Sequence, residues 1–209
     1  MSKVVGFQDQ DFALFTIADL DQRMAAIRTL IQPKFTEISE QVETFLTSKL
    51  ERPFYTHIAR HARRTKNPPN ETWVSWSASK RGYKSHPHFQ FGICESHLFI
   101  WFALIYEYPD KQAFAQKLLN QTQFIEKLPN HYYLSGDHTQ SKIEQLTTIN
   151  QDTIHSILKR LETIKKAEFL CGTIIPRKTA AKLGLTDLLT HIIDTYDHLE
   201  PLYLLTVQS

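Results

Sequence analysis

Basic residues are concentrated between Arg52 and Gln90. These 39 residues contain eight Lys or Arg, four His, six aromatic residues and a single acid, Glu71, so their formal charge is +7. The whole chain of 209 residues has a formal charge of +2, which leaves −5 on the other 170 residues. Concentrated positive charge attracts phosphates and carboxylates and adds little to folding. The segment therefore predicts an anionic partner.

Two pieces of this segment carry the candidate anion-binding residues, namely residues 57–66 (HIARHARRTK) and residues 80–88 (KRGYKSHPH). Gly82 can take a positive φ and leave backbone N–H groups pointing outward. We expect a groove between the two pieces that accepts a phosphate-containing ligand, either a nucleotide or nucleic acid. The side chains predicted to bind the anion are Arg60, Arg63, Arg64, Lys80, Arg81, Tyr83 and Lys84.

The alternative is a solvated positive surface whose aromatic neighbours belong to the core. Alternation in the strand predicted over residues 72–79 places Trp76 on the same face as Val74, which favours a core role for Trp76. Trp73 shares its face with Ser75 and Ser77. Trp73 is therefore the better candidate for stacking against a base.

The four histidines of the segment are candidates for acid–base or metal-ligand roles. His86 and His88 are two residues apart and would project to one face of a strand, and His57 and His61 are four apart. The same side chains could instead hydrogen-bond nearby groups where a strand begins. The second hypothesis is therefore an enzyme acting on a small phosphorylated or carboxylated substrate. The third is an interaction or regulatory protein without a small ligand; no particular cofactor or oligomeric state is indicated.

Several common chemistries lack their sequence signatures. The six glycines form neither GxGxxG nor a Walker loop, and no serine lies in GxSxG. Cys94 and Cys171 have no CxxC spacing and lie in apolar surroundings, so we expect reduced, buried thiols and no nucleophilic role for Cys94. The first ten residues lack an apolar run and the longest apolar stretch, residues 98–106, is too short to span a bilayer. We expect a cytoplasmic protein without a membrane partner.

Hydrophobic periodicity predicts helices at both ends of the chain and strands between them. A helix is expected from Thr16, interrupted at Gln32-Pro33 and followed by a second helix. A hairpin through Glu95-Ser96 should join strands 88–94 and 98–106, the latter buried on both faces. Further expected elements are helices at 109–119, 122–128, 139–166 (long and amphipathic) and 186–198, and strands at 131–134, 169–175 and 202–207.

The order of these elements indicates an α+β fold with a mainly antiparallel sheet, or a mixed one, packed against helices. The length suits a single domain over residues 1–209, with an N-terminal helical segment of about residues 9–50 packed on it.

Three stretches of the chain resemble a known family. They are FTIADLDQRMAAIRTLIQPKF, HARRTKNPPNETWVSWSASKRGYKSHPHFQFGI and LFIWFALIYE. Together they resemble the YktB-like proteins, an uncharacterised group from low-GC Gram-positive bacteria. The resemblance implies an α+β fold and a soluble bacterial protein, and it implies no catalytic role for any residue.

Overall fold

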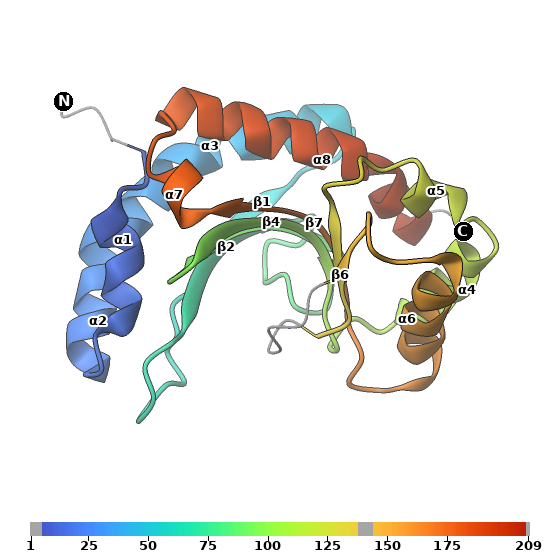
Figure 1. The fold of residues 1–209 in the computed structure, drawn as a ribbon, viewed down its shortest axis with the longest axis horizontal. Coiled ribbons are helices and arrows are strands. Elements are labelled where there is room, and N and C mark those ends of the chain that lie inside the picture. The colour runs from blue at the N-terminus through green and yellow to red at the C-terminus, as the bar shows by residue number, and fades with distance from the viewer. Residues whose placement is uncertain (1–5, 138–143, 208–209) are drawn as a thin grey trace.

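One antiparallel sheet organises the part of the chain that the structure describes, residues 6–137 and 144–207 of a computed structural model. Its strands lie in the order β1-β2-β3-β4-β7-β5-β6, and every neighbouring pair is antiparallel (Figure 1). The predicted α+β class is confirmed, and the alternative of a mixed sheet is not seen among the described strands. The strands are β1 (Tyr55–Ile58), β2 (Glu71–Ser77), β3 (His88–Cys94), β4 (His97–Leu104), β5 (Tyr133–Ser135), β6 (Glu144–Gln145) and β7 (Phe169–Pro176).

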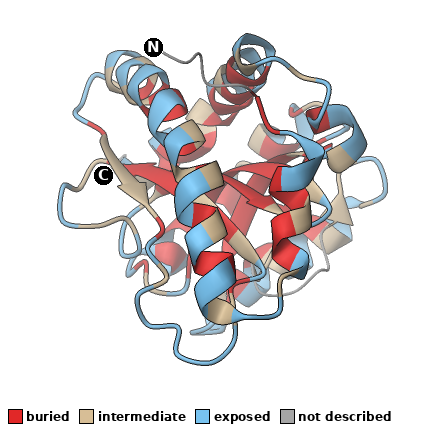
Figure 2. Cartoon of the chain, turned by 90° about the vertical axis from the view of Figure 1, so that its left-hand side faces the viewer, coloured by how far each residue is buried: buried red, intermediate tan, exposed pale blue. Residues whose placement is uncertain are grey.

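The sheet is bent into an arch, and its outer face carries the main core. Two long helices, α3 (Gln32–Lys49) and α8 (Leu185–Val207), lie over this outer face (Figure 1). Phe91 of β3 contacts Phe35 of α3, and Trp76 of β2 contacts Tyr196 of α8, with ring centroids 5.8 and 6.0 Å apart. Figure 2 shows that the helix faces turned toward the sheet are buried and the opposite faces exposed.

The inner face of the sheet has a different composition. Because side chains alternate along a strand, the residues between the core positions point to the inside of the arch. Phe99, Trp101, Ala103 and Leu170 form a second, smaller hydrophobic cluster there. Polar residues of the same face are buried as well: Ser75, Ser77, His88, Gln90 and Ser135. The inner face therefore combines buried polar groups with aromatic rings.

The N-terminal helices follow the predicted order with finer divisions. α1 (Asp9–Ala13) and a 3₁₀ turn (Leu14–Thr16) precede α2 (Leu20–Ala26), which Asp19 caps by accepting the N–H of Gln22 at 2.9 Å. A π turn, η2 (Ile27–Ile31), then leads directly into α3. Pro33 lies in the first turn of α3, directly after the π turn, so the chain stays helical where an interruption was expected.

The C-terminal half contains two wrong predictions. Within the expected helix at 139–166, residues 139–143 lie outside the described residues, 144–145 form β6, and helix α6 (Gln151–Thr163) begins only where Asn150 accepts the N–H of Thr153. The expected strand at 202–207 is the end of α8, which continues through Pro201 because Leu202, Tyr203 and Leu205 are buried against the core. The remaining helices are α4 (Lys111–Leu119), α5 (Gln123–Glu126) and α7 (Arg177–Ala180).

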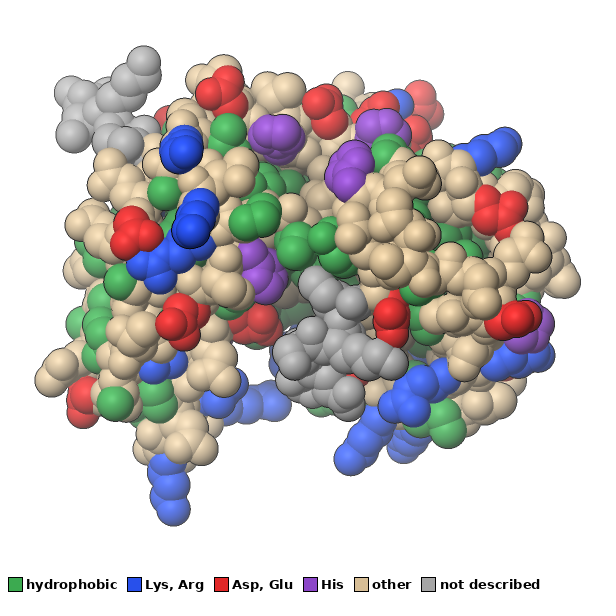
Figure 3. Space-filling model, in the orientation of Figure 1, with side chains coloured by type: hydrophobic (Ala, Val, Ile, Leu, Met, Phe, Trp, Pro, Cys, Tyr) green, Lys and Arg blue, Asp and Glu red, His purple; other side chains and the backbone are tan. Residues whose placement is uncertain are grey.

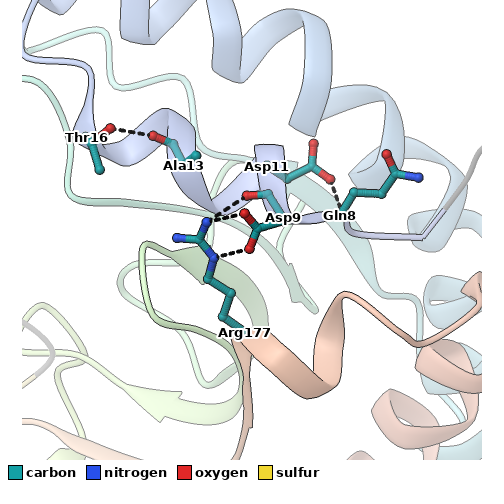
Figure 4. Close-up of polar contacts among 6 residues, drawn as sticks. All are labelled: Gln8, Asp9, Asp11, Ala13, Thr16 and Arg177. Atoms are coloured by element: carbon teal, nitrogen blue, oxygen red, sulfur yellow. Dashed lines mark hydrogen bonds and ion pairs between the residues drawn. The ribbon is translucent and has the colours of Figure 1, made fainter.

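One ion pair joins helix α1 to the first residue of α7 (Arg177–Ala180). The guanidinium of Arg177 donates from Nε and Nη2 to the two carboxylate oxygens of Asp9, each at 2.6 Å (Figure 4). This hydrogen-bonded pair lowers the pKa of Asp9. The backbone N–H of Arg177 donates to the carbonyl of Ser96 at 2.9 Å. Arg177 therefore connects α1 to the turn between β3 and β4.

Two further predictions can be checked against the fold. Cys171 is buried as expected, but Cys94 is only half-buried at the end of β3, which corrects its assignment to the core. Among the described residues, no helix combines the length and the apolar character needed to cross a bilayer.

Candidate anion-binding cavity on the inner face of the sheet

The loop that joins β2 to β3 folds back over the inner face of the sheet. Tyr83, in this loop, packs its ring against His57 of β1 and His88 of β3, with centroids 5.8 and 4.9 Å apart. Its hydroxyl oxygen accepts the indole N–H of Trp73 at 2.9 Å. These three partners come from three adjacent strands, so Tyr83 attaches the loop to the sheet. We call residues 78–87 the Tyr83 loop.

Polar side chains of the inner face hold the backbone of the Tyr83 loop. His57 donates from Nε2 to the carbonyl of Ser79 at 2.9 Å, because a carbonyl can only accept. The hydroxyl of Ser77 lies 3.3 Å from both the Ser79 and the Gly82 carbonyls. His88 donates from Nδ1 to the His86 carbonyl at 2.9 Å. These hydrogen bonds supply polar partners to His57, Ser77 and His88 on this face.

A cavity of about 520 Å³ opens beside the Tyr83 loop. This volume lies within the range of about 300–1,000 Å³ that is usual for small-ligand sites. Its lining combines cations, hydroxyl groups, one histidine and one carboxylate. The lining residues are Ser79, Arg81, Gly82, Tyr83, Lys84, Ser85, His86 and Glu107.

Glu107 gives this cavity its single acidic group. Its Oε1 lies 3.9 Å from Nζ of Lys84 and accepts the hydroxyl of Tyr106 at 3.3 Å. Its Oε2 is buried and has no hydrogen-bond partner among the described residues. A buried carboxylate oxygen without a donor is costly, so a hydroxyl or amine of a ligand would be favoured there.

The loop between β1 and β2 reaches the same region from the other side. The positive charge of Arg63 acts on Tyr106, whose pKa is raised chiefly by the neighbouring charge of Glu107 and lowered in part by Arg63. The loop is fixed at its far end, where Nη1 of the buried Arg23 donates to the Pro69 carbonyl at 2.8 Å. Residues 57–66 and 80–88 therefore approach each other around Tyr106 and Glu107.

Only part of the predicted anion-binding set lines the cavity. Arg81, Tyr83 and Lys84 do so, whereas Lys80 precedes them and Arg60, Arg63 and Arg64 belong to the other loop. In the described part of the chain, the exposed side chains of Arg60, Arg63, Arg64, Lys80 and Arg81 form no ion pair. In Figure 3, Lys and Arg side chains lie along the lower edge of the view, below the arch of the sheet.

Trp73 and the histidines have partners that the sequence did not indicate. Trp73 lies beneath Tyr83 and meets the edge of His61, with centroids 5.4 Å apart, so its indole is engaged within the protein. Among the four histidines, only His86 lines the cavity. Within residues 6–137 and 144–207, no group of three or more His, Cys, Asp or Glu side chains is placed to hold a metal ion.

His61 is held in an unusual environment. It has a left-handed backbone with φ of 51°, and its Nε2 lies 3.0 Å from the Thr72 hydroxyl. Burial, reinforced by the charge of Arg64, lowers the pKa of His61 to about 4. The imidazole is therefore neutral at pH 7.

The sequence reasoning missed two contributors to this site. Ser77 was seen only as part of an alternating strand, yet its hydroxyl holds the Tyr83 loop. Glu107 was not included in the predicted anion site, because its place after β4 gave no hint that it faces the loop. The run of serines at every second position of β2 is the one signal that pointed to a polar inner face.

Comparison with known proteins identifies relatives over nearly the whole chain. The family described as a domain of unknown function (DUF1054) matches residues 7–203. A UPF0637 protein of Oceanobacillus iheyensis is 45% identical over 204 residues, which cover 98% of each chain. UPF0637 proteins of Exiguobacterium sibiricum and Lysinibacillus sphaericus are 43% and 40% identical, over 94% and 95% of this chain and 96% and 94% of theirs. These matches agree with the resemblance to the uncharacterised YktB-like proteins.

The lowered pKa of His61 predicts a contribution to acid sensitivity. The folded state favours the neutral imidazole. The free energy of unfolding should therefore fall as the pH drops from about 6.5, the pKa expected in the unfolded chain, toward about 4. In His61→Asn, which tolerates the left-handed backbone, we expect the loss between pH 7 and pH 4.5 to shrink by about 1–2 kcal/mol after allowance for solvent screening. Urea unfolding at both pH values measures this. An unchanged pH dependence would contradict the assigned environment, and the exposed His131→Asn serves as control.

Attachment of the Tyr83 loop can be tested by limited digestion with trypsin, because Lys80, Arg81 and Lys84 are cleavage sites within it. Replacing Tyr83 by Ala removes the ring contacts and the indole acceptor, so we expect cleavage in the loop to become about tenfold faster, equivalent to roughly 1.4 kcal/mol of local stability. Tyr83→Phe keeps the ring and should change the rate less. Cleavage after Arg63 and Arg64 provides the internal control. Equal rates in Tyr83→Ala and the wild type would mean that the ring does not hold the loop.

Proposed function

The chain belongs to the DUF1054 family, a family of unknown function, and on that premise we propose that it binds a small phosphate-bearing ligand in the cavity beside the Tyr83 loop. The observation that carries this proposal is one cavity of suitable size that holds Arg81, the loosely paired Lys84, and a buried carboxylate oxygen of Glu107 with no hydrogen-bond partner among the described residues. The cations favour an anionic group, and the carboxylate favours a hydrogen-bond donor.

The anionic end of the ligand is assigned to Arg81 and Lys84. Arg81 lines the cavity and forms no ion pair with a described residue, so its guanidinium is available for a bidentate contact with phosphate oxygens. Lys84 is only loosely paired, at 3.9 Å from Glu107, and can turn toward a phosphate as a point charge. Exposed basic groups of this kind can bind a phosphate without the full free-energy cost of removing both charges from water.

The neutral end of the ligand is assigned to Glu107. A carboxylate repels phosphate, so the phosphate must lie away from Glu107, toward Arg81. The Glu107 side chain is 29% exposed, so a small rotation of its carboxylate would let Oε2 accept a hydroxyl from the same ligand. A ribose or another polyol that carries both a phosphate and free hydroxyls satisfies the two ends together, which favours a nucleotide or a sugar phosphate.

Nucleic acid is the alternative ligand that the same basic residues could bind. It would use the exposed Arg60, Arg63 and Arg64 together with Lys80 and Arg81, and its affinity would fall steeply with salt as counterions are released. The acid at the edge of the cavity favours the small ligand, because a polynucleotide backbone offers no donor at regular spacing for Glu107 apart from the ribose 2′-hydroxyl of RNA.

An enzyme that acts on such a ligand remains a second candidate function, supported by a single observation. His86 is the one predicted acid–base histidine that lines the cavity, where it could transfer a proton to or from a bound substrate. His57 and His88 instead hold the backbone of the Tyr83 loop. A reaction would therefore depend on His86.

Calorimetric titration with adenosine monophosphate tests the proposed function. We expect saturable binding at one site, weakened at least tenfold in Arg81→Gln and in Glu107→Ala, because each removes one end of the recognition. Lys127→Gln, which removes an equal charge from outside the cavity, should leave the affinity unchanged.

Two further titrations separate the alternatives. Ribose 5-phosphate that binds as well as adenosine monophosphate would assign a sugar phosphate, and tight, salt-sensitive binding of a twelve-nucleotide single strand alone would assign nucleic acid. Failure of all three probes to bind below millimolar concentration would contradict the proposal.

A further inference from the structure

A cysteine and a histidine face each other across the turn between β3 and β4. Cys94 ends β3 and His97 begins β4, with the two-residue turn Glu95-Ser96 between them. The pairing of Ile93 with Leu98 places the two side chains on the same face of the hairpin. By alternation from Gly92 and Phe99, that face is the inner face of the sheet. The pair lies outside the cavity described above.

The sulfur of Cys94 has three polar contacts within this turn. Sγ lies 3.3 Å from Nδ1 of His97, 3.5 Å from the hydroxyl of Ser96 and 3.5 Å from the carbonyl oxygen of His97. The Ser96 hydroxyl in turn lies 2.8 Å from the same Nδ1. Both Cys94 and His97 are half-buried, so the thiol can be reached from solvent. An imidazole N–H or a hydroxyl that donates to the sulfur favours the thiolate, whereas the carbonyl of His97 can only accept and favours the thiol.

The surrounding charges act in both directions. Burial raises the pKa of Cys94, but the hydrogen bonds and charge of His97 and the hydrogen bonds of Ser96 together lower it below its usual value. Glu71 lies opposite Cys94 on β2 and Glu95 lies in the turn, and both would oppose the thiolate. The charge of Glu95 is offset by Arg23 and Arg177, on each of which it acts.

Cys171 provides a contrast within the same chain. It is fully buried, pairs with Phe102 on the outer face of the sheet, and its pKa is raised by burial. Cys94 belongs to the inner face, so the backbone of the sheet separates the two sulfurs. A disulfide between them is therefore excluded by topology, and any thiol partner of Cys94 must come from another molecule.

We propose that Cys94 is a site of reversible oxidative modification, in which a peroxide and then a low-molecular-weight thiol react with its sulfur. The thiolate attacks the terminal oxygen of the peroxide, the O–O bond breaks, and the oxygen remains on sulfur as a sulfenic acid. With hydrogen peroxide, the departing hydroxide takes a proton and leaves as water, so the sulfur is oxidised by two electrons and the peroxide is reduced. The thiol then attacks this sulfur, an S–S bond forms, the S–O bond breaks, and a second water leaves.

His97 acts here as a positioning residue whose contact with the sulfur favours the ionised form. Without His97, the sulfur would still be partly buried and would still lie near Glu71 and Glu95. Burial and negative charge both favour the neutral thiol. The modification would therefore be selective for Cys94 over Cys171 and would depend on His97. No role of the anion-binding cavity is required.

Alkylation by iodoacetamide, followed by mass spectrometry of the intact native protein, tests the proposal. We expect Cys94 to react at least a hundredfold faster than Cys171. Its rate should rise with pH through a midpoint below about 8.5, the pKa of a free thiol. In His97→Gln the midpoint should rise and the rate at pH 7 should fall about five- to tenfold. His131→Gln, which replaces an exposed histidine elsewhere, should leave both unchanged.

A second readout uses hydrogen peroxide followed by glutathione. We expect a sulfenic acid on Cys94 that dimedone traps, and a mixed disulfide that dithiothreitol reverses. If His97→Gln fails to fold, as judged by circular dichroism, Ser96→Ala takes its place and should also slow the reaction. A midpoint at or above 8.5 in the wild type, or the absence of any dimedone adduct on Cys94, would overturn the proposal.

Discussion

The candidate site depends on the packing of one ring, that of Tyr83, against the inner face of the sheet. The ring contacts His57 and His88, and its hydroxyl accepts the indole N–H of Trp73. These contacts turn the connection between β2 and β3 into a fixed wall, so that Arg81 and Lys84 project beside Glu107. Burial raises the pKa of Tyr83, so the hydroxyl stays neutral and can accept this hydrogen bond near neutral pH.

This arrangement requires polar residues to be buried on the inner face. The sheet accommodates them because its two faces differ in composition. The outer face supplies the apolar core, with rings such as Phe89 and Trp76 under α8. The inner face can then carry Ser77 and His57, whose polar atoms are satisfied by the backbone of the Tyr83 loop. The apolar core and the proposed binding site therefore lie on opposite sides of a single layer of backbone, and the inner face can carry polar residues that the core could not.

The sequence predicted the strands better than it predicted the site. Alternation located β2, β3 and β4 within about two residues, because each strand is buried on a regular set of positions. It failed at Pro201, where burial of Leu202 and Tyr203 keeps the chain helical, and before Asn150, whose cap was not recognised. Charge counting found Arg81 and Lys84, but it could not assign Glu107 or the neighbours of Cys94, because those contacts depend on how loops and turns pack in three dimensions.

The central claim is that one ligand bridges the cations of the Tyr83 loop and the carboxylate of Glu107. A crystal structure grown with saturating adenosine monophosphate tests this most directly. The account predicts a phosphate within hydrogen-bond distance of Arg81 and Lys84, and a ribose hydroxyl on Oε2 of Glu107. An empty cavity at a concentration that occupies the protein in solution, or the nucleotide bound elsewhere on the molecule, would contradict it.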